Sequence, residues 1–214
     1  MGIVKSGIAQ GFSGKVGNMV FSQHEDRETT VSLAPAPSTK APTTDQLSTR
    51  QDTSVCTAFV RPLAEFAKIG FRLQGKLERQ TGYNAMLSYV RKNALTGIYP
   101  NRIVDVSGVL MTRGNMRPPE DAAVQLTGSG LAFSWNPEIK VEGLHFSDQV
   151  VMMAYFPELK MARYMIGGAQ RHAGKDVLML TGIKQGYAAA VYLSFITDNR
   201  EAISDSVYLG QFIW

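Results

Sequence analysis

Residues 118–214 carry the pattern that most restricts how this chain can fold. After Pro118 and Pro119, short runs of β-branched, aromatic and aliphatic residues recur, separated by the turn-forming residues Gly, Asp, Asn and Lys. The apolar residues of this half lack the three- and four-residue spacing of an amphipathic helix. Seven such runs in about 95 residues predict an all-β sandwich. They lie near Val124 and at residues 131–135, 150–156, 162–166, 177–180, 187–196 and 206–212.

The first 44 residues have a different composition. Glycines recur among small and apolar residues up to Gly17, and a charged turn at 24–28 separates two β-prone runs, which predicts a β-hairpin. Pro35, Pro37 and Pro42 then exclude a helix, because proline lacks an amide hydrogen and fixes φ. Such a run is typical of an extended linker. We therefore expect an N-terminal arm over residues 1–44.

Between this arm and the β-rich half, the apolar period is helical. Over residues 47–69 apolar positions recur every three or four residues with Pro62 inside the run, which predicts a helix that kinks or breaks there. A second helix is expected at 83–95, with Gly97 as its stop signal. A connecting strand is expected within 103–112. The predicted fold class is α+β, with an arm at 1–44, a helical segment and connecting strand at 45–117 and a sandwich at 118–214.

The β-rich half resembles a fibronectin type III or related immunoglobulin-like domain. The resemblance rests on Pro118-Pro119 at the entry, on Leu131-Ala-Phe-Ser-Trp135 with its Trp on the second strand, and on a final strand at 204–209. It implies an immunoglobulin-like sandwich. Within it, Tyr187 on the long penultimate strand would serve as the tyrosine corner, whose hydroxyl bonds back to nearby backbone. This fold does not fix a function.

The chain also resembles, from end to end, a family of uncharacterised proteins common in Bacteroidetes genomes. It departs from that family after Asn18, where relatives continue with a Trp- and Gly-containing segment and this chain has Phe21-Ser-Gln-His-Glu-Asp-Arg-Glu. The resemblance implies no assigned activity. The shared motifs are Gly11-Phe-Ser-Gly14-Lys15-Val-Gly17-Asn18, Tyr83-Asn84-Ala85, Lys92-Asn93-Ala94 with Gly97, Arg113-Gly114 and Ser206-Val-Tyr-Leu-Gly210.

The sequence lacks the motifs of several enzyme classes. A phosphate loop needs Gly at position 9 and Ser or Thr after Lys15, where this chain has Ala9 and Val16. Ser13 lies in half of a nucleophile elbow whose closing glycine is replaced by Lys15. The three histidines are far apart, without metal-ligand spacing. We therefore expect no catalytic residue, cofactor or metal. The acidic residues Glu138, Glu142 and Asp148 are expected in a solvated loop.

Cysteine content and hydropathy bear on the compartment. The single cysteine, Cys56, cannot form an intrachain disulfide, and its place on the apolar side of the first predicted helix indicates a buried thiol. No run approaches about 18 apolar residues, so a membrane-spanning helix is not expected. The opening residues lack the apolar core of a secretion signal. These observations predict a protein of the cytoplasm or of a virion.

The arm carries the main functional hypothesis. Evenly spaced glycines on a β-prone segment mark tight turns or close backbone packing, and a long arm suits strand addition or domain exchange with a neighbouring subunit. Accessory domains of tailed-phage virions offer an analogy for an immunoglobulin-like sandwich without a secretion signal. We therefore expect a non-enzymatic structural or assembly protein of a virion or similar particle. Its predicted subunit-contact residues are Gly11, Phe12, Ser13, Gly14, Lys15 and Gly17.

Charge leaves two kinds of partner open. Residues 1–118 hold 15 Lys and Arg against 8 Asp and Glu, and residues 119–214 hold 7 against 10, within a net charge of +4. The asymmetry fits head-to-tail contact between copies or an anionic partner. The alternative function is a monomeric binding module. It would bind nucleic acid through Arg72, Lys76, Arg79, Arg91 and Lys92, with Tyr83 and Tyr89 for stacking, or glycan through Phe146, Tyr155 and Tyr164.

Overall fold

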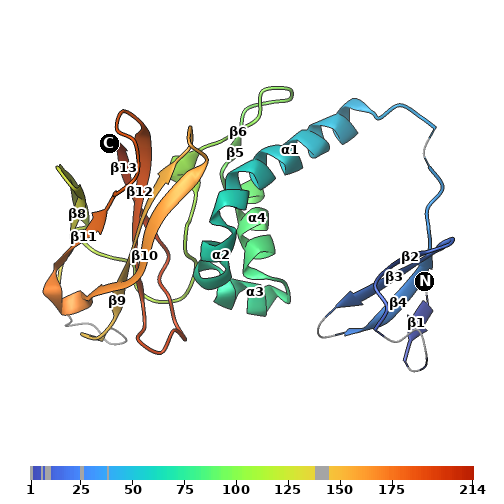
Figure 1. Cartoon of the computed structure of the whole chain (residues 1–214), viewed down its shortest axis with the longest axis horizontal. Helices are drawn as coiled ribbons and strands as arrows, with labels where there is room; N and C mark the ends of the chain where they lie inside the picture. Colours follow the sequence, from blue (N-terminus) through green and yellow to red (C-terminus); the bar gives the residue numbers. More distant parts are fainter. Residues whose placement is uncertain (1, 6, 8–10, 25–26, 38, 138–144) are drawn as a thin grey trace. The chain divides into compact units, whose positions relative to one another are not determined.

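The computed structural model describes residues 2–5, 7, 11–24, 27–37, 39–137 and 145–214 (Figure 1). The chain divides into two compact units, Met1–Thr43 and Thr44–Trp214. The predicted α+β class is confirmed, because a few helices accompany many antiparallel strands in open sheets. We call the first unit the N-terminal sheet and the second the body. Glu138 and Glu142 lie outside the described residues.

The N-terminal sheet contains the predicted hairpin and two further strands. The hairpin strands are β3 (Met19–His24) and β4 (Arg27–Leu33), and the edge strands are β1 (Gly2–Val4) and β2 (Gly14–Val16), in the order β1-β4-β3-β2. A two-residue loop joins β2 to β3. Its first residue, Gly17, has a φ of 58°, a conformation that glycine adopts without steric cost. Residues 34–37 and 39–43 then carry no helix or strand, as the proline pattern predicts.

Five helical elements open the body, and the predicted break at Pro62 is present. They are α1 (Thr44–Val60), the 3₁₀ turn η1 (Arg61–Leu63), α2 (Ala64–Gly70), α3 (Arg72–Glu78) and α4 (Gly82–Asn93). Pro62 falls at the start of η1, where its missing amide hydrogen costs no helical hydrogen bond. The side chain of Thr81 caps α4 by accepting a hydrogen bond from the amide of Asn84 (3.2 Å).

The segment expected as a strand at 103–112 is mostly irregular. It begins with β6 (Ile103–Val104), which pairs with β5 (Leu95–Thr96), and continues into the 3₁₀ turn η2 (Val106–Gly108). The reason lies in Asp105, whose carboxylate accepts hydrogen bonds from the amide and hydroxyl of Ser107 (2.9 and 2.7 Å). This local pairing turns the chain before a longer strand can form.

The seven strands predicted for the second half are present among the described residues, in two antiparallel sheets. The three-stranded sheet, in the order β11-β8-β7, contains β7 (Ala123–Thr127), β8 (Gly130–Ser134) and β11 (Lys175–Met179). The four-stranded sheet, in the order β10-β9-β12-β13, contains β9 (Gln149–Phe156), β10 (Met161–Gln170), β12 (Ala188–Ile196) and β13 (Val207–Ile213). The 3₁₀ turn η3 (Arg171–Ala173) lies between β10 and β11.

Both faces of the four-stranded sheet are covered, as Figure 1 shows for the body. Along β9, Val150, Met152 and their alternate neighbours join Leu131, Phe133 and Trp135 in a core with the three-stranded sheet. The intervening Val151, Met153 and Tyr155 join Phe59 and Phe66 in a second core with the helices. Because successive side chains point to opposite faces, a strand covered on both sides becomes a continuous apolar run. This arrangement makes the helices and the four-stranded sheet one packed structure.

A buried ion pair lies between β8, β9 and η3, where the sequence suggested a solvated acidic residue. The Nε atom of Arg171 lies 3.2 Å from Oδ2 of Asp148, and these side chains are 3% and 1% exposed. The guanidinium also lies 3.7 Å from the centroid of the Phe195 ring, and Trp135 Nε1 donates to the carbonyl oxygen of Arg171 (2.7 Å). The expectation for Asp148 was therefore wrong, because its carboxylate is paired inside the core.

The tyrosine-corner prediction also differs from the structure. The Tyr187 hydroxyl makes no hydrogen bond within the described parts of the chain. Five residues on, the hydroxyl of Tyr192 donates to the carbonyl oxygen of Val106 (2.6 Å) and ties β12 to the connecting segment. Burial and the neighbouring Tyr208 raise the pKa of the Tyr192 hydroxyl far above its ordinary value. It therefore stays protonated and donates this bond.

Candidate functional site

The strand register of the N-terminal sheet sorts its side chains into two unlike faces. Paired residues on adjacent strands share a face, and residues alternate between faces along each strand, so the pair Met19–Leu33 fixes the pattern. One side, which we call the apolar face, carries Gly2, Val4, Gly14, Val16, Met19, Phe21, Thr29, Val31 and Leu33. The opposite, polar face carries Ile3, Lys15, Val20, Ser22, Thr30 and Ser32.

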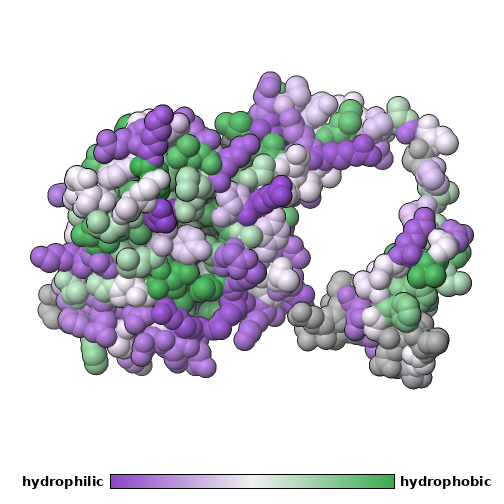
Figure 2. Space-filling view, viewed as in Figure 1, coloured by the Kyte–Doolittle hydropathy of each residue, from purple (hydrophilic) through white to green (hydrophobic). Residues whose placement is uncertain are grey.

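One end of the apolar face is open to solvent within its unit. Val16, Met19 and Leu33 form one row across three strands and are 59%, 51% and 72% exposed. Phe12 is half exposed, and its ring centroid lies 6.2 Å from that of Phe21. Among the described residues of this unit no hydrophobic side chain is buried. Green, apolar residues accordingly show on its surface in Figure 2.

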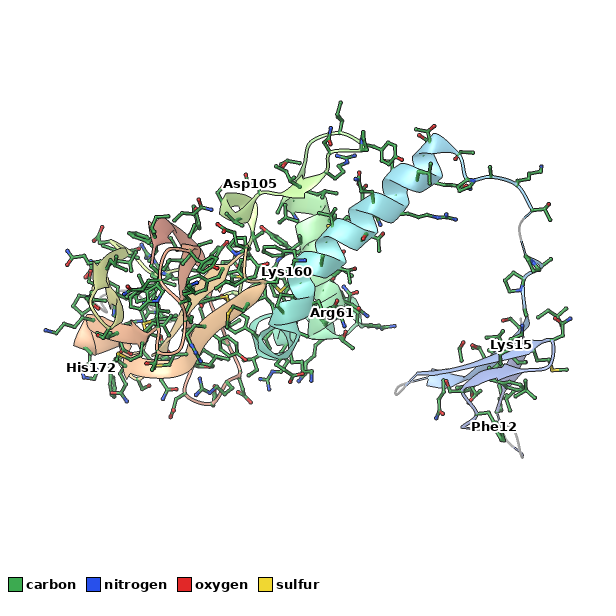
Figure 3. All side chains as sticks on the ribbon, turned by 45° about the horizontal axis from the view of Figure 1, so that its top comes forward. Phe12, Lys15, Arg61, Asp105, Lys160 and His172 are labelled. Carbon is green, nitrogen blue, oxygen red and sulfur yellow. The ribbon has the colours of Figure 1, made fainter. Side chains whose placement is uncertain are left out.

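The predicted contact residues lie in or next to the edge strand β2, but they do not all face the same side of the sheet. Gly14 belongs to the apolar face, Lys15 to the polar face and Gly17 to the hairpin loop. Phe12 lies on the other side of the sheet from Lys15 (Figure 3). The amide of Gly11 donates to Oγ1 of Thr29 (3.2 Å), which fastens the preceding loop to β4. Ser13 is exposed beside β2.

Sequence reasoning missed most of the apolar face. Val31 and Leu33 alternate with Thr30 and Ser32, which is the signal of a half-buried strand. Only the pairing of β4 with β3 shows that this alternation continues into Met19 and Phe21 on the neighbouring strand. The face is therefore a property of the sheet and not of one motif.

The basic residues proposed for nucleic acid lie on α3, at its C-cap and on α4. Lys76 and Arg79 are exposed at the end of α3, where Arg79 adopts a left-handed conformation as the C-cap. Arg91 and Lys92 line a hollow of about 490 Å³ between α1 and α4, together with Thr53, Cys56, Asn84, Leu87 and Ser88. Arg72 lines a different hollow, described below.

Of the aromatic residues predicted to stack on bases or sugars, Tyr89 and Tyr155 pack against the core. Tyr89 packs against Phe71 and under the guanidinium of Arg113, and its burial raises the pKa of its hydroxyl. Tyr155 is 2% exposed with its ring 4.8 Å from Phe59, so its prediction as an exposed loop aromatic was wrong. It belongs to β9, whose helix-facing side is covered. The remaining exposed aromatics are Phe146 and Tyr164, at 64% and 37%.

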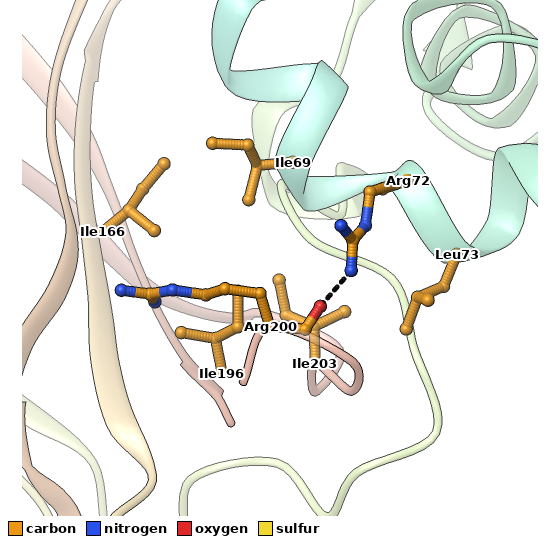
Figure 4. Close-up of a pocket in the computed structure, with 7 residues that line it drawn as sticks. All are labelled: Ile69, Arg72, Leu73, Ile166, Ile196, Arg200 and Ile203. Carbon is orange, nitrogen blue, oxygen red and sulfur yellow. Dashed lines mark hydrogen bonds between the residues drawn. The ribbon is translucent and has the colours of Figure 1, made fainter. Parts of the chain in front are cut away.

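The second hollow, which we call the isoleucine cleft, lies between the helices and the four-stranded sheet. It measures about 440 Å³ and combines five aliphatic side chains with two arginines (Figure 4). Helices α2 and α3 contribute one side, and β10, β12 and the loop after β12 contribute the other. Its lining residues are Ile69, Arg72, Leu73, Ile166, Ile196, Arg200 and Ile203.

Reactive and metal-binding groups do not gather in the described part of the chain. No set of three His, Cys, Asp or Glu side chains is placed there to hold a metal ion. Cys56 is fully buried as predicted, and burial, followed by the charge of Asp52, raises the pKa of its thiol. The thiol is therefore protonated and a poor nucleophile. None of the described helices is long and apolar enough to cross a bilayer.

Comparison with known proteins adds a family but no activity. None of the curated proteins matches this chain. A family model described as "Family of unknown function (DUF6266)" matches residues 11–210, which include β2 to β4 and the whole body up to the last strand. The expectation of an uncharacterised family is confirmed: the chain belongs to this family of unknown function.

Proposed function

We propose that this protein is a non-enzymatic assembly protein whose N-terminal sheet docks, through its apolar face, onto the same face of a second copy. One observation carries the proposal: the described N-terminal sheet buries no hydrophobic side chain of its own. An isolated sheet of this size gains little free energy from its strands alone and needs a covering layer. The short edge strand β2 carries Lys15, and charged short edges oppose edge-to-edge pairing. Face-to-face packing is therefore favoured over strand addition.

A second copy satisfies the geometry of this surface. Two sheets pack about 10 Å apart when both present apolar side chains, and a two-fold axis lets one patch serve both subunits. Val16, Met19 and Leu33 are 59%, 51% and 72% exposed, so burial of this row would contribute roughly 1–2 kcal/mol for each side chain. The proline-containing linker at 34–43 allows the sheet to reach a neighbour while the body stays folded.

The strand order of the body supports the proposal that its β-rich part is an accessory domain of a particle. We infer an immunoglobulin-like sandwich of the fibronectin type III kind, because β7, β8 and β11 form one sheet and β9, β10, β12 and β13 form the other. A virion or a similar particle is the setting in which we place this protein. The basic first half and acidic second half add the charge complementarity that neighbouring copies can use.

Light scattering over a concentration series tests the proposal. We expect wild-type protein to form a discrete oligomer of at least twice the 23.5 kDa chain mass. Leu33→Lys places a charge on the apolar face and should return the protein to a monomer. Ser32→Lys adds the same charge to the adjacent residue on the polar face and should leave the oligomer intact. A wild-type monomer at every concentration, or equal effects of both variants, would contradict the proposal.

A further inference from the structure

The isoleucine cleft has the size and shape of a small-molecule site. Its volume of about 440 Å³ lies within the roughly 300–1,000 Å³ that such sites occupy. Ile196 and Ile203 are each 2% exposed and form its floor, whereas Ile69 is 40% exposed at the rim. Figure 4 shows Ile69 and Ile166 standing opposite each other above this floor. The cleft can therefore enclose a hydrocarbon group and remove it from water.

Two positive charges flank this apolar space, and no acidic residue lines it. Arg72 donates a hydrogen bond to the main-chain oxygen of Arg200 (Figure 4). Within the described residues neither arginine forms an ion pair, and Nη1 of Arg200 is buried without a hydrogen-bond partner. A buried guanidinium donor without an acceptor is unfavourable, and an anionic acceptor removes that cost.

The backbone makes room for the Arg200 guanidinium. Gly167 has a φ of 79°, and a Cβ atom built there would collide with Nη2 of Arg200 and lie 2.6 Å from Oε1 of Gln149. The guanidinium therefore lies against the main chain of β10. Any side chain at position 167 would occupy the space that the guanidinium fills. Oε1 of Gln149 is also buried without a partner there. The unsatisfied donor of Arg200 and the unsatisfied acceptor of Gln149 thus lie beside the same glycine, and of the two residues only Arg200 lines the cleft.

We propose that the isoleucine cleft binds an aliphatic carboxylate. The hydrocarbon part contacts the isoleucines, the carboxylate accepts a hydrogen bond from Arg200, and Arg72 supplies a second positive charge. A neutral hydrocarbon would leave the buried donor of Arg200 without an acceptor, and a compact anion would leave the apolar floor exposed to water. The site lies entirely in the body, so it stands independently of the docking of the N-terminal sheet.

Methyl-resolved NMR of the full chain, titrated with octanoate, tests this site. We expect saturable shifts at the methyl groups of Ile69, Ile166, Ile196 and Ile203, with Ile98 and Ile103 on the distant exposed hairpin unchanged. Octan-1-ol should bind about tenfold more weakly, because it lacks the charge that Arg200 recognises. Absence of saturable shifts, equal shifts at Ile98, or equal affinity for octan-1-ol would overturn the proposal.

Two variants of Arg200 and its neighbour make the test specific. Arg200 has a φ of 61°, which glycine accommodates readily, so Arg200→Gly should fold and bind octanoate at least tenfold more weakly. Lys160→Gly is the matched control, because Lys160 is also a basic turn residue with positive φ (49°) but does not line the cleft. Gln149→Glu places a carboxylate beside Arg200 and should likewise weaken octanoate binding. Wild-type affinity in Arg200→Gly would overturn the proposal.

Discussion

Two four-stranded antiparallel sheets, among the residues that the structure describes, differ in what covers them. The described N-terminal sheet buries no hydrophobic side chain, whereas β9 and β12 in the body are buried along almost their whole length. Both sheets have four antiparallel strands, so the number of strands does not distinguish them. Their covering layers differ, and removal of apolar surface from water is the dominant favourable contribution to folding. Within its own unit, the described part of the N-terminal sheet has no counterpart of the helices and the three-stranded sheet that cover the body's sheet.

The largest change in stability is expected when a buried charge is removed from the body. Asp148→Ala leaves the Arg171 guanidinium buried without its carboxylate, and such losses cost about 3–5 kcal/mol. We expect that loss in the free energy of unfolding of the body, measured by urea denaturation. Glu65→Ala is the control, since Glu65 pairs with Lys68 on the surface, where both side chains are more than half exposed. It should change stability by less than about 1 kcal/mol.

A weak effect of Asp148→Ala would show that this end of the sandwich opens to water. This end of the body would then be no better shielded from water than the N-terminal sheet. An equally large effect of Glu65→Ala would show that general charge loss, and not burial, governs the result.

Adjacent methionines on β9 test whether both faces of the four-stranded sheet carry packing energy. Met152 faces the three-stranded sheet and Met153 faces the helices, and they are 0% and 1% exposed. Each change to alanine should destabilise the body by about 2–5 kcal/mol. Unfolding should remain one transition for both variants, followed by circular dichroism and by tryptophan fluorescence, since Trp135 lies in the sandwich core. A large loss for Met152→Ala alone would mean that the helices are only loosely attached.

The same contrast explains which parts of the molecule the sequence could predict. Local signals indicated the break at Pro62, the buried Cys56 and the alternating strands at 131–135, because each depends on near neighbours. The apolar run at 150–156 predicted a strand. It did not predict that the helices cover the second face of that strand, because a continuous apolar run does not show what packs on each side. Asp148 stands next to exposed-looking residues and finds Arg171 only through the pairing of β9 with β10.

The two candidate sites were hidden for the same reason. The isoleucine cleft combines residues near 70, 166 and 200, which come together only when the helices cover the four-stranded sheet. Arg72 is exposed, but the hollow beside it also needs Ile166 and Arg200, which lie far away in the sequence. The apolar face of the N-terminal sheet was predicted in part, as a contact around Gly14. Its most exposed side chain, Leu33, pairs with Met19 at the far end of the β3–β4 hairpin, and the row continues to Val16 on a third strand.

The smallest expected effect concerns Asp105, where a loop replaces the connecting strand. Hydrogen bonds from the Ser107 hydroxyl and amide lower the pKa of the Asp105 carboxyl below its ordinary value. A group whose pKa is lowered in the folded state adds stability above its unfolded pKa, and this contribution disappears as pH falls through the folded pKa. Ser107→Ala removes the hydroxyl and should raise the Asp105 pKa toward the ordinary value, measured by NMR titration of the carboxyl carbon.

The body should stay folded, because the carboxylate is exposed to solvent and its charge is well hydrated. An unchanged pKa would mean that the amide of Ser107 alone holds the turn. In that case backbone geometry, rather than the Asp105–Ser107 side-chain pair, ends β6 after two residues.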